Sequence, residues 1–224
     1  MPRLPERPFL KWAGGKSALL GEILSRLPAK IETYYEPFVG GGAVFFALAR
    51  EGRFRHAVLS DANRELIDVY LAVKDDIDKL IAQLKKLREG HSEEQYYALR
   101  EQKPRARIQR AARVIYLNKT GYNGLYRVNR SGEFNVPYGR YTNPNVCDEP
   151  NLRAAHATLA NVTVQVGDFE QICARARPGD AVYLDPPYVP LSKTASFTAY
   201  DRHPFGMDEQ RRLAQAFARL RERG

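Results

Sequence analysis

The spacing of apolar residues alternates along the chain between the three-to-four-residue period of helices and the short continuous runs of buried strands. Residues 16–27 have leucines and an isoleucine at helical spacing, and Pro28 follows where a helix cannot easily continue. The predicted order in the first third is helix 16–27, strand 34–39, helix 43–50, strand 57–60 and a long helical stretch from about residue 63. This alternation is typical of an α/β protein.

The middle of the chain has a different character. Ser92 followed by Gln95 matches a capping box that opens a helix, whereas residues 118–141 are dense in Gly, Asn, Tyr and Arg, which suits an ordered loop or hairpin. Strand-like apolar runs return at 162–166 and 181–184. We therefore predict a doubly wound, Rossmann-like α/β domain that is interrupted from the mid-sixties to about residue 150 by a mostly helical insertion.

Composition narrows the class of protein and of partner. The 224 residues include 35 Lys and Arg against 26 Asp and Glu, a formal charge of +9. This excess favours a polyanionic partner such as nucleic acid or an acidic membrane, with solubility alone as the simpler interpretation. Cys147 and Cys173 form no CxxC pair, so no disulfide framework or metal site is predicted and a reducing cytoplasm fits best. The apolar runs are too short for membrane insertion or secretion to be expected.

Two glycine motifs resemble nucleotide-binding signatures without completing them. The segment 15–17, Gly-Lys-Ser, lacks the glycine that a P-loop requires at position 10, and the run 40–42 lacks the one that a dinucleotide fingerprint requires at position 45. An ATPase and a dehydrogenase are therefore disfavoured. A glycine turn after the first strand, with Asp61 after the second, still suits an adenosine moiety. A helix-start turn and a capping Asp would explain either feature alone.

The most specific signal is Asp185-Pro186-Pro187-Tyr188, which follows an apolar strand. Two consecutive prolines fix a rigid turn whose carbonyls project without competing N–H groups. Asp185 and the Pro186 carbonyl can each accept one N–H bond from the exocyclic amine of a planar base, while Tyr188 stacks on its ring. The alternative is a loop with an exposed acid and a packing tyrosine. We predict that all four residues are catalytic.

Several motifs in a fixed order carry a resemblance to a known family. They are KWAGGK at 11–16, EPFVGGG at 36–42, Asp61, DPPY at 185–188, GYNGLYR at 121–127 and GEFNVPYGRY at 132–141. The first four resemble the α-group of amino-methyltransferases. The two loop sequences resemble the bacterial DNA adenine methylases of the Dam family, which modify GATC, and the resemblance covers nearly the whole chain.

The resemblance implies S-adenosylmethionine as the methyl donor. The N-terminal motif, the glycine turn after the first strand and the acid after the second would surround this donor. The acid and the aromatic residue after the third strand would hold its adenine. The implied cofactor-binding residues are Trp12, Lys16, Phe38, Gly40, Gly42, Asp61, Asp168, Phe169 and Asp185.

A DNA-binding surface is predicted from the basic and aromatic residues between 105 and 141, which could bind phosphates and stack where a base leaves the helix. A solvated helix face is the alternative for the arginines at 105–113. The resemblance adds Lys11 and Arg127 as readers of guanine edges and Arg140 as a phosphate clamp. The implied DNA-binding residues are Lys11, Tyr122, Asn123, Leu125, Arg127, Pro137 and Arg140.

The implied reaction is methyl transfer to N6 of an adenine that is flipped out of duplex DNA, at GATC. Residues 1–65 and 151–224 would form the catalytic core, and residues 66–150 the target-recognition insertion with its hairpin loop at 121–141. N4-cytosine methylation and an inactive, truncated DNA-binding remnant are the alternatives.

The last predicted element is a helix at 207–224 with Leu213, Phe217 and Leu220 on one apolar face. In the family the sheet continues with further strands beyond the one that carries DPPY. We therefore expect a further segment or a partner to complete the sheet.

Overall fold

The computed structural model describes residues 8–12, 16–129, 131–187 and 205–223. Tyr188 of the DPPY motif, and Gly14 and Gly15 of the N-terminal motif, lie outside the described residues. Within the described ranges, no helix has the length and apolar character needed to cross a bilayer. The same ranges contain no group of three or more His, Cys, Asp or Glu side chains that could hold a metal ion.

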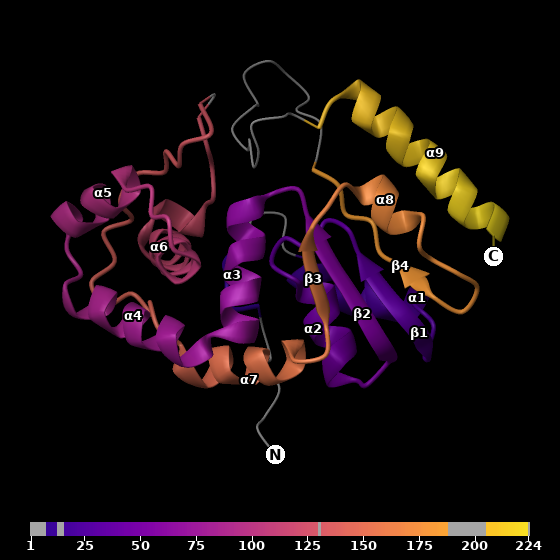
Figure 1. Cartoon of the computed structure of the whole chain (residues 1–224), viewed down its shortest axis with the longest axis horizontal. Coiled ribbons are helices and arrows are strands. Elements are labelled where there is room, and N and C mark those ends of the chain that lie inside the picture. The colour runs from indigo at the N-terminus through magenta and orange to yellow at the C-terminus, as the bar shows by residue number, and fades with distance from the viewer. Residues whose placement is uncertain (1–7, 13–15, 130, 188–204, 224) are drawn as a thin grey trace.

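Among the described residues, four parallel strands form the sheet at the centre of the fold (Figure 1). They are β1 (Ile31–Glu36), β2 (Phe54–Asp61), β3 (Thr163–Val166) and β4 (Ala181–Val182), in the order β3-β2-β1-β4. The chain winds outward from β1 through β2 to β3 and then crosses to the other side of β1. The carboxyl ends of β1 and β4 therefore flank the point where the winding reverses, which is where ligands bind in open α/β sheets.

The helices of the described residues surround this sheet and extend away from it (Figure 1). In chain order they are α1 (Leu20–Arg26), α2 (Ala43–Arg50), α3 (Arg64–Asp75), α4 (Ile77–Glu89), α5 (Glu93–Glu101), α6 (Arg107–Thr120), α7 (Glu149–Leu159), α8 (Phe169–Cys173) and α9 (Met207–Arg223). Short 3-10 turns at Ser17–Leu19 and Tyr122–Gly124 precede α1 and follow α6.

Helices cover both faces of the sheet because successive strand residues point to opposite sides. Tyr34 and Leu59 join the large core that includes α2 and α3, whereas Tyr35 and Val58 pack with Ile172 of α8 on the other face. A parallel sheet between two layers of helices is the predicted Rossmann-like α/β fold, which is thereby confirmed.

The helices α3 to α7 lie between β2 and β3 in the chain. α3 packs against α6 and α7, and α4, α5 and α6 lie farther from the strands than α3 does (Figure 1). After α6, antiparallel bridges join Gly121 to Tyr138 and Val128 to Phe134. These bridges fold residues 121–141 back on themselves. The division of the chain into a catalytic core and an insertion stays a prediction.

Several predicted details differ in the structure, some of them for local reasons. The first strand runs over Ile31–Glu36 and not over 34–39, and it ends earlier because Pro37 has no N–H for the ladder. The long helix expected from residue 63 is divided at Asp76, whose φ of −135° is not helical. Phe217, expected on the apolar face of α9, is 53% exposed, and Ala216 is buried in its place. Leu213 and Leu220 pack against the core as predicted, so Leu213, Ala216 and Leu220 form the buried face of α9.

Candidate active site

Asp185 lies beyond β4, beside the point where the winding of the sheet reverses. Lys16 from the N-terminal motif reaches it, with Nζ 2.6 Å from Oδ2, and the two side chains are only 13% and 25% exposed. Such shelter makes an ion pair stronger than one in open solvent. Pro186 and Pro187 follow as half-buried residues. Two motifs that are far apart in the sequence therefore meet at one carboxylate.

The glycine turn after β1 is fixed by Asp61 at the end of β2. The Gly40 N–H donates to Asp61 Oδ2 over 3.2 Å, and the Asn63 N–H donates to Oδ1 over 2.9 Å. On the other side of the turn, the Tyr70 hydroxyl donates to the Gly40 carbonyl over 3.1 Å. The turn and the acid that the sequence pairs as an adenosine site are thus in direct contact.

Two glycines of this turn are required both by conformation and by space. Gly40 and Gly42 have φ values of 48° and 70°, in the left-handed region that favours glycine. A Cβ at Gly40 would lie 2.9 Å from Cδ1 of Trp12, and one at Gly42 would lie 2.6 Å from the Tyr70 hydroxyl. The indole of Trp12 therefore lies directly against the glycine turn.

Glu36, the last residue of β1, is a buried acid that the sequence analysis does not assign to the site. Its side chain is 3% exposed, and the Tyr34 hydroxyl donates to Oε2 over 2.9 Å. Burial raises the pKa of this carboxyl to about 8, and the charges of Asp185 and Asp61 add to the rise. The sequence feature that could have indicated a buried acid here is its position between a buried residue of the strand and Pro37.

Phe38, Asp168 and Phe169 lie together on the α8 side of the sheet. Phe38 and Phe169 stack with their ring centroids 5.3 Å apart at 29°. Asp168 Oδ1 accepts from the Glu170 N–H over 2.9 Å, capping α8, and from Arg212 Nη2 of α9 over 2.8 Å. The Arg212 guanidinium also lies 5.0 Å from the Phe169 centroid. α9 therefore contributes a residue beside the expected adenine-binding pair, which the sequence does not indicate.

Asn118 of α6 joins Lys11 to the loop at 121–141. Its Oδ1 accepts from the Lys11 N–H over 2.8 Å, and its Nδ2 donates to the carbonyls of Lys11 and Gly124 over 2.6 and 3.0 Å. Lys11 Nζ lies 5.1 Å from the centroid of the Tyr141 ring. The N-terminal lysine and the loop, both expected to contact DNA, therefore lie side by side.

Most other residues expected to contact DNA are exposed on this loop. Tyr122, Asn123, Pro137 and Arg140 are exposed and Leu125 is half-buried, and the Tyr122 N–H donates to the Pro137 carbonyl over 2.9 Å. Asn123 and Arg140 have φ values of 53° and 54°, which are uncommon for residues other than glycine. Strained conformations of this kind cluster at binding sites.

Arg127 and the arginines of α6 form contacts within the protein. Arg127 donates to Asn135 through Nε to Oδ1 over 2.7 Å and through Nη2 to the backbone carbonyl over 3.1 Å. The α6 arginines pair with acids of α3 and of its C-terminal end, namely Arg107 with Asp75 and Asp76, Arg110 with Asp68, and Arg113 with Glu65. Most of the positive charge at 105–113 is therefore neutralised by ion pairs within the protein. Lys11 and the loop at 121–141 are then the better candidates for contacting DNA.

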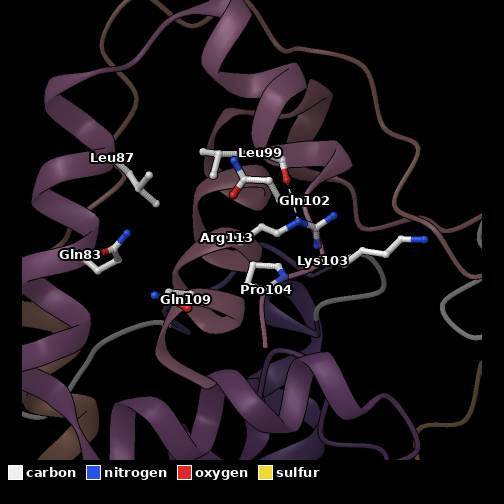
Figure 2. A pocket seen from close by; sticks show the side chains of 8 residues that line it. All are labelled: Gln83, Leu87, Leu99, Gln102, Lys103, Pro104, Gln109 and Arg113. Carbon is white, nitrogen blue, oxygen red and sulfur yellow. Dashed lines mark hydrogen bonds between the residues drawn. The ribbon is translucent and has the colours of Figure 1, made fainter. Parts of the chain in front are cut away.

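A cavity of about 410 Å³ lies among α4, α5 and α6. Figure 2 shows the side chains that line it, which are Gln83, Leu87, Leu99, Gln102, Lys103, Pro104, Gln109 and Arg113. Arg113 forms part of its wall and donates through Nε to the Leu99 carbonyl over 2.7 Å (Figure 2). The cavity includes Arg113 of the basic run at 105–113 but none of the expected cofactor-binding residues, and it is separate from the site around Asp185.

A parallel sheet with a glycine turn after β1 and carboxylates after β2 and β4 is the architecture of enzymes that bind nucleotide-like cofactors. Residues 12–224 match the family of D12 class N6 adenine-specific DNA methyltransferases. The chain belongs to this family. The predicted class of enzyme, an adenine-specific DNA methyltransferase, is thereby confirmed.

Individual relatives agree with this assignment over almost the entire chain. A type II methyltransferase of Methanocaldococcus jannaschii is 46% identical over 235 residues, covering 97% of this chain and 81% of the relative. The DNA adenine methylase of Escherichia coli K12 is 42% identical over 221 residues, covering 97% and 77%. That of Haemophilus influenzae is 37% identical over 218 residues, covering 95% and 74%. The resemblance to DNA adenine methylases that the motifs indicate is thus confirmed.

Proposed function

We propose that this chain transfers a methyl group from S-adenosylmethionine to N6 of an adenine in duplex DNA, at the sequence GATC, with the adenine flipped out of the helix. The observation that carries the proposal is the carboxylate of Asp185, held by Lys16 at the reversal point of the sheet. An exocyclic amine that reaches this point meets an acceptor whose position is already fixed.

The residues around the glycine turn suit the methyl donor. Gly40 and Gly42 let the backbone approach a ligand closely, and Asp61 is placed to accept bonds from ribose hydroxyls. Lys16 can pair with the carboxylate of the donor. When bound, the donor supplies an electrophilic methyl group on a positively charged sulfur. The proposed cofactor-binding residues are Trp12, Lys16, Phe38, Gly40, Gly42, Asp61, Asp168, Phe169 and Asp185.

The proposed catalytic role of the DPPY motif is to orient the amine. The lone pair of N6 is delocalised into the purine ring, so the planar amine is a poor nucleophile. Bonds from its two N–H groups to Asp185 and the Pro186 carbonyl favour a pyramidal nitrogen whose lone pair points away from the ring. Orientation and a matched negative charge then lower the barrier. Pro187 keeps the turn rigid, and we propose from the sequence that Tyr188 stacks on the base.

The proposed DNA-binding surface comprises Lys11 and the loop at 121–141, carried by a target-recognition part at residues 66–150. The position of Lys11 Nζ over the Tyr141 ring of the loop and the exposure of Tyr122 and Pro137 support this assignment. Aromatic and apolar side chains of this kind separate base steps, and basic ones bind guanine edges and phosphates. We also propose a cytoplasmic location, which the absence of a CxxC pair in the sequence favours. The proposed DNA-binding residues are Lys11, Tyr122, Asn123, Leu125, Arg127, Pro137 and Arg140.

A transfer assay with nucleoside analysis tests the proposal. The protein is incubated with methyl-labelled S-adenosylmethionine and either a GATC duplex or a scrambled duplex of the same composition, and the DNA is then digested to nucleosides. We expect label in N6-methyladenine from the GATC duplex alone. Equal label in both duplexes would refute GATC recognition but retain adenine chemistry. Label in N4-methylcytosine, or none above an Asp185→Ala control, would refute the proposal itself.

A further inference from the structure

Tyr126 belongs to the proposed DNA-binding loop, and its side chain faces the proposed cofactor site. Its ring stacks on the indole of Trp12, with centroids 5.0 Å apart at 26°, and the five-membered ring of that indole lies against Gly40. Phe134, from the opposite side of the loop, packs edge-on against Tyr126 with centroids 5.6 Å apart. The ring is 4% exposed, so it is held on all sides. One side chain thus contacts residues assigned to both ligands.

The hydroxyl of Tyr126 is fixed by a carboxylate on α3. It donates to Glu65 Oε2 over 2.7 Å, and Arg113 Nη1 of α6 lies 3.5 Å from Oε1 of the same carboxylate. Arg113 is anchored in turn to the carbonyls of Leu99 and Arg100 over 2.7 and 2.6 Å. Burial raises the pKa of the Tyr126 hydroxyl, so it remains a donor at neutral pH. Glu65, which lies on α3, therefore links Tyr126 of the loop to α3 and, through Arg113, to α6.

We propose that Tyr126 is a positioning residue that couples binding of DNA at the 121–141 loop to binding of the methyl donor beside Trp12. The inference rests on the proposed function, because it takes the loop as the DNA contact and the glycine turn as the donor contact. Because Tyr126 belongs to the loop, a shift of the loop on binding DNA moves its ring, and the stacked indole of Trp12 moves with it. By linkage, the donor then favours the DNA-bound form of the loop to the same extent.

The coupling is measurable with the full chain, S-adenosylhomocysteine as an unreactive analogue of the donor, and a GATC duplex. The coupling ratio is the Kd of S-adenosylhomocysteine without DNA divided by its Kd with saturating DNA. Calorimetry gives both values, and Trp12, the single tryptophan of the chain, gives an independent fluorescence signal. For the wild type we expect a ratio on the order of tenfold.

Tyr126→Phe keeps the stacked ring and removes the bond to Glu65. We expect its coupling ratio to fall below that of the wild type, because the ring is no longer fixed to Glu65, while the Kd without DNA changes by less than about threefold. Glu65→Gln should lower the ratio in the same direction. If the hydroxyl acts through Glu65, the double variant should show no further loss beyond the larger single effect.

Tyr116→Phe is the matched control. It also removes a tyrosine hydroxyl bond in this region, to His91 Nδ1 over 2.8 Å, and the Tyr116 ring packs edge-on against His91 with centroids 5.7 Å apart. This control should keep the wild-type ratio even where it lowers the melting temperature. A wild-type ratio in Tyr126→Phe, or an equal loss in Tyr116→Phe, would overturn the inference. If the wild type binds S-adenosylhomocysteine with the same Kd with and without DNA, the coupling is overturned but the proposed function is not. If the wild type does not bind S-adenosylhomocysteine, the proposed function is contradicted as well.

Discussion

The ammonium of Lys16 lies 2.6 Å from the carboxylate of Asp185 and joins the N-terminal motif to the turn after β4. The two residues are 169 positions apart, so this contact forms only when β4 has taken its place beside β1. The proposed base site and the proposed donor site therefore share one ion pair. Changes to either residue should affect the two ligands in different ways.

Lys16→Met should weaken donor binding. The variant keeps much of the side-chain volume and removes the charge that we assign to the donor carboxylate. The Kd of S-adenosylhomocysteine should rise by at least about tenfold, as expected when one member of a sheltered ion pair is lost. Calorimetry measures this change, and Lys86→Met, at an exposed site on α4, is the control that removes the same charge elsewhere. An unchanged Kd in Lys16→Met would exclude a donor contact.

Gly40→Ala should destabilise the protein and also weaken donor binding. Gly52 provides a matched comparison, since its φ is 64° but nothing lies within 4 Å of an added Cβ. Gly52→Ala should therefore cost only the backbone strain, about 1 kcal/mol. Gly40→Ala adds a contact of 2.9 Å with Trp12, so its loss in the free energy of unfolding should be larger. Urea unfolding and calorimetry with S-adenosylhomocysteine measure both effects, and equal behaviour of the two variants would contradict the close contact.

Arg127→Ala should relax discrimination at one base pair of the recognition site. A bidentate contact to guanine contributes about 1–3 kcal/mol of specificity. In the structure the guanidinium is held by Asn135, so binding guanine requires this arginine to share or exchange those bonds. Methylation rates on GATC and on duplexes with single substitutions measure the effect, with Arg50→Ala on α2 as an exposed control. An equal loss on every duplex would instead mark Arg127 as a phosphate contact.

The buried acid Glu36 should make stability depend on pH. Because its pKa in the folded protein is about 8, the folded chain retains a proton that the unfolded chain releases near pH 4.5. The free energy of unfolding therefore falls as the pH rises through this window and levels off above it. Glu36→Gln removes this dependence, so its stability relative to the wild type should increase by at least about 1 kcal/mol between pH 5.5 and 8.

Urea unfolding at these two pH values measures the change in Glu36→Gln. The exposed Glu89→Gln at the end of α4 is the control, and its difference from the wild type should be the same at both pH values. Parallel pH curves for the wild type and Glu36→Gln would show that Glu36 is ionised in the folded protein.

Local sequence patterns were sufficient to predict the principal elements of the fold. Ser92 caps α5 as its motif indicates, accepting from the Gln95 N–H over 3.1 Å. The helix at 43–50 has the predicted bounds, because a glycine turn precedes it and its apolar face is buried. The order of the motifs also placed Asp61 near Gly40, since the carboxyl ends of neighbouring parallel strands meet at one edge.

Contacts between distant residues could not be predicted, because no local spacing records them. The spacing of the arginines at 105–113 does not indicate that Arg110 pairs with Asp68 on α3. The same spacing is equally consistent with a DNA-binding face. The stack of Tyr126 on Trp12 joins residues more than a hundred positions apart. Such pairings depend on how the helices pack, which is decided by the assembled core.

The most direct test of the central claim is the single-turnover rate of methyl transfer to a GATC duplex by Asp185→Asn. The variant keeps the shape of the side chain and removes the negative charge that we assign to the adenine amine. We predict that transfer becomes slower by about a hundredfold or more, as for the loss of one group that stabilises developing charge. The affinity for the duplex should stay close to that of the wild type. A variant that transfers the methyl group at the wild-type rate would contradict the account.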